Sequence, residues 1–158
     1  MKHLRLLIAL SILGLVAAVG SFALVHAQSE EKQGTNGLSY VTTVKTSNGA
    51  FASRGVITLH ADHTMSVTDS GQGGPAFLFS SQLGSWKPDG KGGIVAKTID
   101  FDFPSVDVAR LDYTISFGLN GTATGTITLT TFPLQGNPLD GGGTVVGVFT
   151  FTGQLIQP

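Results

Sequence analysis

The chain has 158 residues, of which 12% are charged, and its nine basic and ten acidic side chains leave a net charge of −1. This balance lacks the excess of basic residues that is typical of nucleic-acid-binding proteins. The sequence contains no cysteine, which excludes a disulfide framework, a thiol nucleophile and a thiolate metal site. Its 22 glycines and many threonines favour short strands joined by tight turns.

The first 27 residues have the pattern of an export signal. Lys2 and Arg5 precede an apolar run at 6–25, and the small residue Ala27 follows just before a polar stretch. We therefore expect a signal helix over 1–27 that is cleaved, which gives a secreted or periplasmic protein. The run is also long enough, at roughly 30 Å as a helix, to remain as a membrane anchor on the extracytoplasmic side. Membrane contact is expected only through this segment.

Residues 28–37 are polar and show no periodicity, which predicts a flexible linker before a single folded domain at 38–158. The domain is predicted to be all-β, because its β-branched runs are short and are bounded by Gly, Pro, Asn or Asp. Most segments between the runs have hairpin length, so consecutive strands should be antiparallel neighbours. The expected strands are 38–46, 53–60, 64–70, 76–87, 93–103, 108–117, 123–132 and 143–156.

Apolar and polar residues alternate along the later strands, which predicts one buried face. In the sixth strand, for example, Leu111 and Tyr113 alternate with Asp112 and Thr114. Such a meander can close into a single eight-stranded antiparallel up-and-down barrel, and closure leaves no exposed edge. A two-sheet β-sandwich is the alternative, because the longer connections could cross from one sheet to the other.

The fifth strand shows a similar alternation, and its large apolar side chains are assigned to the interior. The predicted inward set is Val95, Ile99, Phe101 and Phe103, with Lys97 in the same alternation. The opposite set contains Asp100 and Asp102, which at this spacing could act in acid/base chemistry or hold a cation. Because their face is opposite the apolar one, we expect them to lie in water on the outer wall.

Motifs for metal binding or nucleophilic catalysis are weak. His60-Ala61-Asp62-His63 offers two imidazoles and a carboxylate, but on a strand-turn-strand these groups need not converge, so a solvated turn shaped by Asp62 is expected. The sequence has no Gly-x-Ser-x-Gly elbow, and the glycine-rich segment 71–74 lacks the lysine and helix of a phosphate loop. We therefore expect neither a metal nor a cofactor.

Gly84-Ser85-Trp86 is a Gly-x-Trp motif that contains the only tryptophan of the chain. As part of an exported eight-stranded meander, it makes the chain resemble the lipocalin-like or calycin-like β-barrels, and more loosely the allene oxide cyclase-type barrels. The resemblance covers residues 38–157 and implies a barrel that can hold an apolar cavity. From its size and chemistry, Trp86 is expected to close one end of the barrel, with its indole N–H bound to an acceptor.

Together these patterns favour an extracytoplasmic barrel that binds a small hydrophobic or amphipathic molecule without catalysis. One alternative is a barrel-type cyclase or isomerase assisted by Tyr113 or an inward carboxylate. An ionisable side chain on the inner face, for which Lys97 is the candidate, would distinguish it. The other alternative is a filled structural domain of the cell envelope. The candidate ligand contacts, which would serve equally as core filler, are Tyr40, Phe79, Trp86, Phe101, Tyr113, Phe117, Phe149 and Phe151.

Overall fold

The computed structural model describes residues 37–73, 78–103 and 105–158, so the predicted signal helix and nearly all of the predicted linker lie outside the described residues. No helix within these ranges is long and apolar enough to cross a membrane. The described chain forms eight strands and two short 3-10 turns. They are β1 (Leu38–Thr46), β2 (Phe51–Leu59), β3 (Thr64–Asp69), η1 (Ser70–Gln72), β4 (Gln82–Pro88), β5 (Gly93–Asp102), β6 (Asp107–Phe117), η3 (Leu119–Gly121), β7 (Thr122–Pro133) and β8 (Thr144–Leu155).

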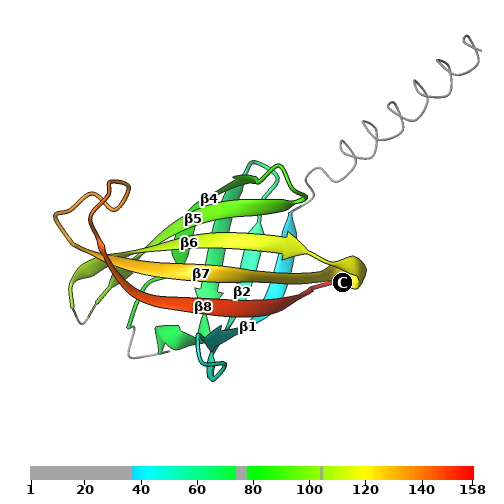
Figure 1. Ribbon diagram of the computed structural model, residues 1–158, viewed down its shortest axis with the longest axis horizontal. Coiled ribbons are helices and arrows are strands. Elements are labelled where there is room, and N and C mark those ends of the chain that lie inside the picture. Colours follow the sequence, from blue (N-terminus) through cyan, green and yellow to red (C-terminus); the bar gives the residue numbers. More distant parts are fainter. Residues whose placement is uncertain (1–36, 74–77, 104) are drawn as a thin grey trace, which may run out of the picture. The chain divides into compact units, whose positions relative to one another are not determined.

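The strands form one closed antiparallel barrel in chain order, in which β8 pairs with β1 (Figure 1). This confirms the all-β up-and-down prediction, and the closed ring excludes the two-sheet sandwich. The connections after β1, β3, β5 and β7 lie at one end of the barrel, which we call the loop end. The connections after β2, β4 and β6 lie at the other end, the turn end. The β7–β8 connection projects from the loop end at the left of Figure 1.

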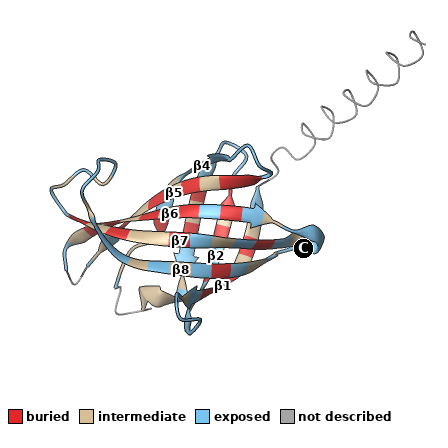
Figure 2. Cartoon of the chain, in the orientation of Figure 1, coloured by how far each residue is buried: buried red, intermediate tan, exposed pale blue. Residues whose placement is uncertain are grey.

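Side chains from opposite walls meet inside the barrel. The rings of Tyr40 on β1 and Phe117 on β6 lie 5.9 Å apart between centroids, although these two strands are not neighbours. Figure 2 shows buried residues concentrated along β5 and β6, whereas β8 is exposed over most of its length. The core consists of Tyr40, Val44, Ile57, Leu59, Met65, Val67, Ile94, Ala96, Ala109, Leu111, Tyr113, Ile115, Ala123, Ile127 and Phe151.

The predicted orientation of β5 is wrong. Its register places Ile94 opposite Ile115 and Ala96 opposite Tyr113, and directly opposite residues of an antiparallel pair share a face. The inward set is therefore Ile94, Ala96, Thr98, Asp100 and Asp102, and the outward set is Val95, Lys97, Ile99 and Phe101. Both faces of β5 carry apolar residues, so local alternation could not choose between them. The ring of Phe101 falls on the outer wall and is 50% exposed, and Phe103, just beyond the strand, is 51% exposed.

The outward position of Phe101 leads to a direct prediction about stability. Replacing Phe101 with Thr, which keeps a good strand former, should change the free energy of unfolding by no more than about 0.5 kcal/mol, as is usual for exposed positions. Denaturant unfolding of the two proteins measures this difference. A loss of roughly 3 kcal/mol or more, which is typical of truncating a buried phenylalanine, would place the ring inside.

Trp86 closes the turn end as the sequence predicts. Its indole packs against the core, stacks on the ring of His63 with centroids 4.4 Å apart, and donates its N–H to the carbonyl oxygen of His60 at 3.1 Å. The turn beneath the ring is shaped by Asp62, whose Oδ1 accepts from the backbone N–H of Thr64 at 3.0 Å. The two histidines therefore belong to a structural turn, as expected.

Candidate functional site

Four polar side chains face the interior from β4, β5 and β6, and we call them the inner polar cluster: Gln82, Thr98, Asp100 and Tyr113. Each is at most 5% exposed. The hydroxyl of Tyr113 donates to Oε1 of Gln82 at 2.5 Å, and Oγ1 of Thr98 donates to the same oxygen at 3.1 Å. Because Oε1 of Gln82 already accepts two hydrogen bonds, a ligand would contact the NH₂ group of this side chain.

Asp100 is the unsatisfied member of this cluster. Its Oδ1 is buried and has no hydrogen-bond partner among the described residues. Burial, and secondly the negative charge of Asp102, raises the pKa of Asp100 from 3.8 to about 7. A buried carboxyl group in this state either keeps its proton or needs a ligand that supplies a hydrogen-bond donor or a positive charge.

Three further carboxyl groups lie on the inner face of β3, β5 and β6 at the loop end, and we call them the carboxylate rim: Asp69, Asp102 and Asp107. Asp102 lies directly opposite Asp107 in the β5–β6 register, and burial followed by the charge of Asp107 raises its pKa. Asp69 is different because it already has partners: it caps η1 by accepting from the backbone N–H of Gly71 at 2.7 Å, and it accepts from Oγ of Ser53 at 2.8 Å. Asp69 therefore has a structural role, whereas Asp100 has none that the contacts reveal.

The inner wall becomes apolar on the side away from β4. Thr98 lies opposite Leu111, Leu111 lies opposite Leu129, and Leu129 lies opposite Gly147. The ring of Phe149 covers Gly147, since a Cβ there would lie 2.8 Å from it. Leu111, Leu129 and Phe149 form what we call the apolar strip. The last two are only partly buried, so solvent reaches this wall. The distance across the sheet from β5 to β8 is three interstrand steps, or about 14 Å.

The eight predicted aromatic contacts do not form one site. Tyr40, Trp86 and Phe117 lie at the turn end, Tyr113 belongs to the inner polar cluster, and Phe149 belongs to the apolar strip. Phe151 is buried in the wall, opposite Gly125 and Val44. Phe79 pairs with Asp102 through an isolated bridge and so lies beside the carboxylate rim. The interior position predicted for Phe101 is wrong.

Lys97, the predicted inward cation, lies on the outer wall. Its Nζ is 3.3 Å from Oδ1 of Asp112, and Nε of Arg110 is 2.8 Å from Oδ2 of the same carboxylate. Arg110 also donates to the carbonyl oxygen of Pro138 at 2.9 Å, which holds the β7–β8 connection against the barrel. The inner face of β5 therefore carries carboxyl groups instead of a lysine, among them the buried Asp100, which alternation predicts to lie in water.

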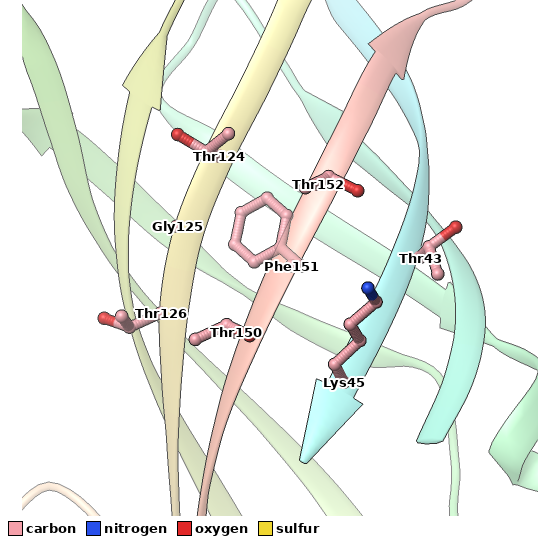
Figure 3. A pocket seen from close by; sticks show the side chains of 8 residues that line it. All are labelled: Thr43, Lys45, Thr124, Gly125, Thr126, Thr150, Phe151 and Thr152. Atoms are coloured by element: carbon pink, nitrogen blue, oxygen red, sulfur yellow. The ribbon is translucent and has the colours of Figure 1, made fainter. Parts of the chain in front are cut away.

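A second candidate is a groove of about 360 Å³ on the outer wall across β7, β8 and β1 (Figure 3). Figure 3 shows the ring of Phe151 over Gly125, with threonines on both sides and Lys45 beside them. The groove is lined by Thr43, Lys45, Thr124, Gly125, Thr126, Thr150, Phe151 and Thr152. Its exposed hydroxyl groups can be satisfied by water, so nothing in the groove demands a ligand in the way that buried Asp100 does.

The described barrel is a closed eight-stranded meander, an architecture that fits the lipocalin-like barrels. No protein-family model, no curated protein and no solved structure matches the chain. Among the described residues, no group of three or more His, Asp or Glu side chains is arranged to hold a metal ion.

Proposed function

We propose that the protein binds a small amphipathic molecule at the loop end of its barrel. The polar part of this molecule would occupy the inner polar cluster, and its apolar part would lie along the apolar strip. The observation that carries this proposal is the buried Oδ1 of Asp100, which has no partner among the described residues. A polar atom in this state is costly in a folded protein unless something binds to it.

The inner wall also supports an amphipathic ligand over a purely hydrophobic one. Within three interstrand steps it passes from Asp100 and Thr98 to Leu129 and Phe149. A hydrocarbon would leave the carboxyl group unsatisfied, and a fully polar molecule would leave the apolar strip in contact with water. Kinship with the lipocalin-like or calycin-like barrels, and an extracytoplasmic location set by the leader at 1–27, are part of the same proposal.

Binding of decanol, a neutral amphipathic probe, tests the proposed function. In ¹H–¹⁵N NMR titrations we expect backbone amide shifts at Thr98, Leu111 and Leu129, and little change at Tyr40 in the turn end. Filling the apolar strip by replacing Leu129 with Trp should weaken decanol binding at least about tenfold, because the larger ring takes the space of the alkyl chain.

The matched control is Thr128→Trp, which adds the same ring on the outer wall and should leave decanol affinity within about twofold. Far-UV circular dichroism checks that both variants are folded. Amide shifts confined to Thr124 and Thr150 would instead place the ligand in the outer groove. The absence of saturable shifts anywhere in the barrel would refute the proposed function.

Proton-transfer catalysis is the second candidate function, and Asp100 is the observation that favours it. A carboxyl group with a pKa of about 7 is half ionised at neutral pH, which suits it to take a proton from one carbon of a substrate and return it to another. Tyr113 is less suited to this role, because burial raises its pKa and its hydroxyl is committed to Gln82. Deuterium uptake from D₂O into a bound β,γ-unsaturated ketone, lost in D100N, would establish this activity.

A further inference from the structure

We infer that the amphipathic molecule is an organic amine, whose ammonium group contacts Asp100 and whose alkyl or aryl part follows the apolar strip. This inference rests on the proposed function and adds the chemical class of the ligand's head group. Three properties of the loop end support it: the sign of its charge, the repulsion between its carboxyl groups, and the number of donors that they can accept.

The interior of the loop end carries charge of one sign. Asp100 and the carboxylate rim bring four carboxyl groups to it from β3, β5 and β6. In contrast, the lysines and arginines of the described strands are on the outer wall: Lys45, Arg54, Lys87, Lys97 and Arg110. Among the described strands, no basic side chain therefore neutralises the interior. A cation that enters this end meets only attractive charge.

The carboxyl groups also repel one another. Asp102 lies directly opposite Asp107, and Asp100 lies two residues from Asp102 on the same face of β5. Like charges at directly opposed positions destabilise a sheet, and a buried carboxylate without a partner adds a further cost. A positive group between them relieves both costs at once.

The donor count separates the three simplest head groups. An ammonium group offers three N–H donors and a positive charge, so it can satisfy Oδ1 of Asp100 and still interact with Asp102. An alcohol offers one donor and no charge. A carboxylate offers no donor and adds repulsion, so fatty acids should be excluded from this site.

The charge state of the site sets how binding depends on pH. The titratable groups on the inner face of the strands around Asp100 are Asp102 on its own strand, Asp107 and Tyr113 on β6, and Asp69 on β3. Tyr113 stays neutral because burial raises its pKa, so the charge of the site becomes only more negative as the pH rises. Asp100, with a pKa of about 7, is mostly protonated at pH 6 and mostly ionised at pH 8. Amine affinity should therefore rise about tenfold over this interval.

Calorimetric titration of the full chain with decylamine, decanol and decanoate at pH 8 tests the inference. These probes share one chain length, which suits a strip of about 14 Å, and differ only in the head group. Decylamine should bind at least about tenfold more tightly than decanol, and decanoate should bind more weakly than both. D100N should weaken decylamine at least about tenfold and leave decanol within about twofold, while D112N on the outer wall should change neither.

Each possible outcome decides a separate point. If decanol binds but decylamine binds no more tightly, the amine inference is wrong and the proposed function stands. If D100N leaves decylamine unchanged, the amine inference is wrong, and the amide shifts induced by decanol decide whether the proposed function stands. If none of the three probes binds, both fail. Calcium chloride alone is the remaining probe: calcium binding that displaces decylamine and is lost in D100N would overturn the inference in favour of a metal site. Circular dichroism confirms that D100N is folded before its affinities are compared.

Discussion

D100N should be more stable than the wild-type protein at pH 8, by roughly 2 to 4 kcal/mol in the free energy of unfolding. The cause is the raised pKa of Asp100, about 7 in the folded protein against 3.8 ordinarily. Each pKa unit corresponds to about 1.4 kcal/mol, so the full difference is about 4 kcal/mol. Water near the loop end and the new amide's own need for partners reduce this value.

The pH dependence of this difference identifies its origin. Between pH 4 and 7 the folded protein keeps the Asp100 proton that the unfolded chain has released, so the folded state binds more protons and wild-type stability falls as the pH rises. Urea unfolding of both proteins from pH 4 to pH 8 measures the difference in their free energies of unfolding. The difference between the two proteins is the readout, because carboxyl groups that do not interact with Asp100 contribute equally to both profiles. D112N should retain the wild-type slope. Parallel wild-type and D100N profiles would contradict the assignment.

A stabilising D100N variant that no longer binds an amine would show that the protein gives up stability for function at this position. Such trade-offs are expected at binding sites, where side chains are selected for a ligand rather than for the folded state alone. Bound amine should restore the lost stability by mass action, so the same ligand should raise the unfolding temperature of the wild type more than that of D100N.

Gly84→Ala should lower the free energy of unfolding by about 3 kcal/mol or more and the unfolding temperature by on the order of 10 °C. A Cβ at Gly84 would lie 1.9 Å from the carbonyl oxygen of Lys97 and 2.7 Å from Cα of Thr98. Both are backbone atoms of β5, which is held by ladders to β4 and β6, so they cannot move aside without breaking strand pairing. Thermal unfolding followed by circular dichroism measures the change.

Gly141→Ala is the matched control, because a Cβ there would meet nothing within 4 Å. It should shift the free energy of unfolding by less than about 0.5 kcal/mol. If Gly84→Ala were as mild as this control, β4 and β5 would have to be farther apart than the structure shows. The result also bears on the Gly-x-Trp motif: Gly84 permits close strand approach and Trp86 closes the turn end, so both residues have structural roles.

The strand order was predictable because it depends on local signals, whereas closure depends on the pairing of β8 with β1, which are far apart in the sequence, and a sandwich remained the alternative. Short turns specify antiparallel neighbours, and Leu111 and Tyr113 alternate with polar residues that leave no doubt about their face. β5 lacks this contrast, since Val95 and Ile94 are adjacent and equally apolar. The choice of its inner face is made by the register with β6, which is a property of two strands rather than of one.

The candidate site was misplaced for the same reason. Asp100 breaks the rule that inward positions are apolar, so alternation alone assigns it to water. The sequence did hold a usable signal, namely the connection between β5 and β6. With Asp102 opposite Asp107, odd-numbered residues of β6 pair with even-numbered residues of β5, and the inward Tyr113 then places Asp100 inside. Functional residues commonly occur where local and global patterns disagree in this way.

The pairing of β8 with β1 places the last strand of the barrel directly beside the first. The backbone N–H of Ile156 donates to the carbonyl oxygen of Ser39 at 2.8 Å, so the two extremities of the barrel are neighbours in space. Since every strand forms backbone hydrogen bonds only with the strands before and after it in this cycle, no strand is topologically first. A circular permutant with a short linker across this junction, opened in the turn after β4, should preserve all eight interfaces. The barrel should therefore form whichever strand is synthesised first.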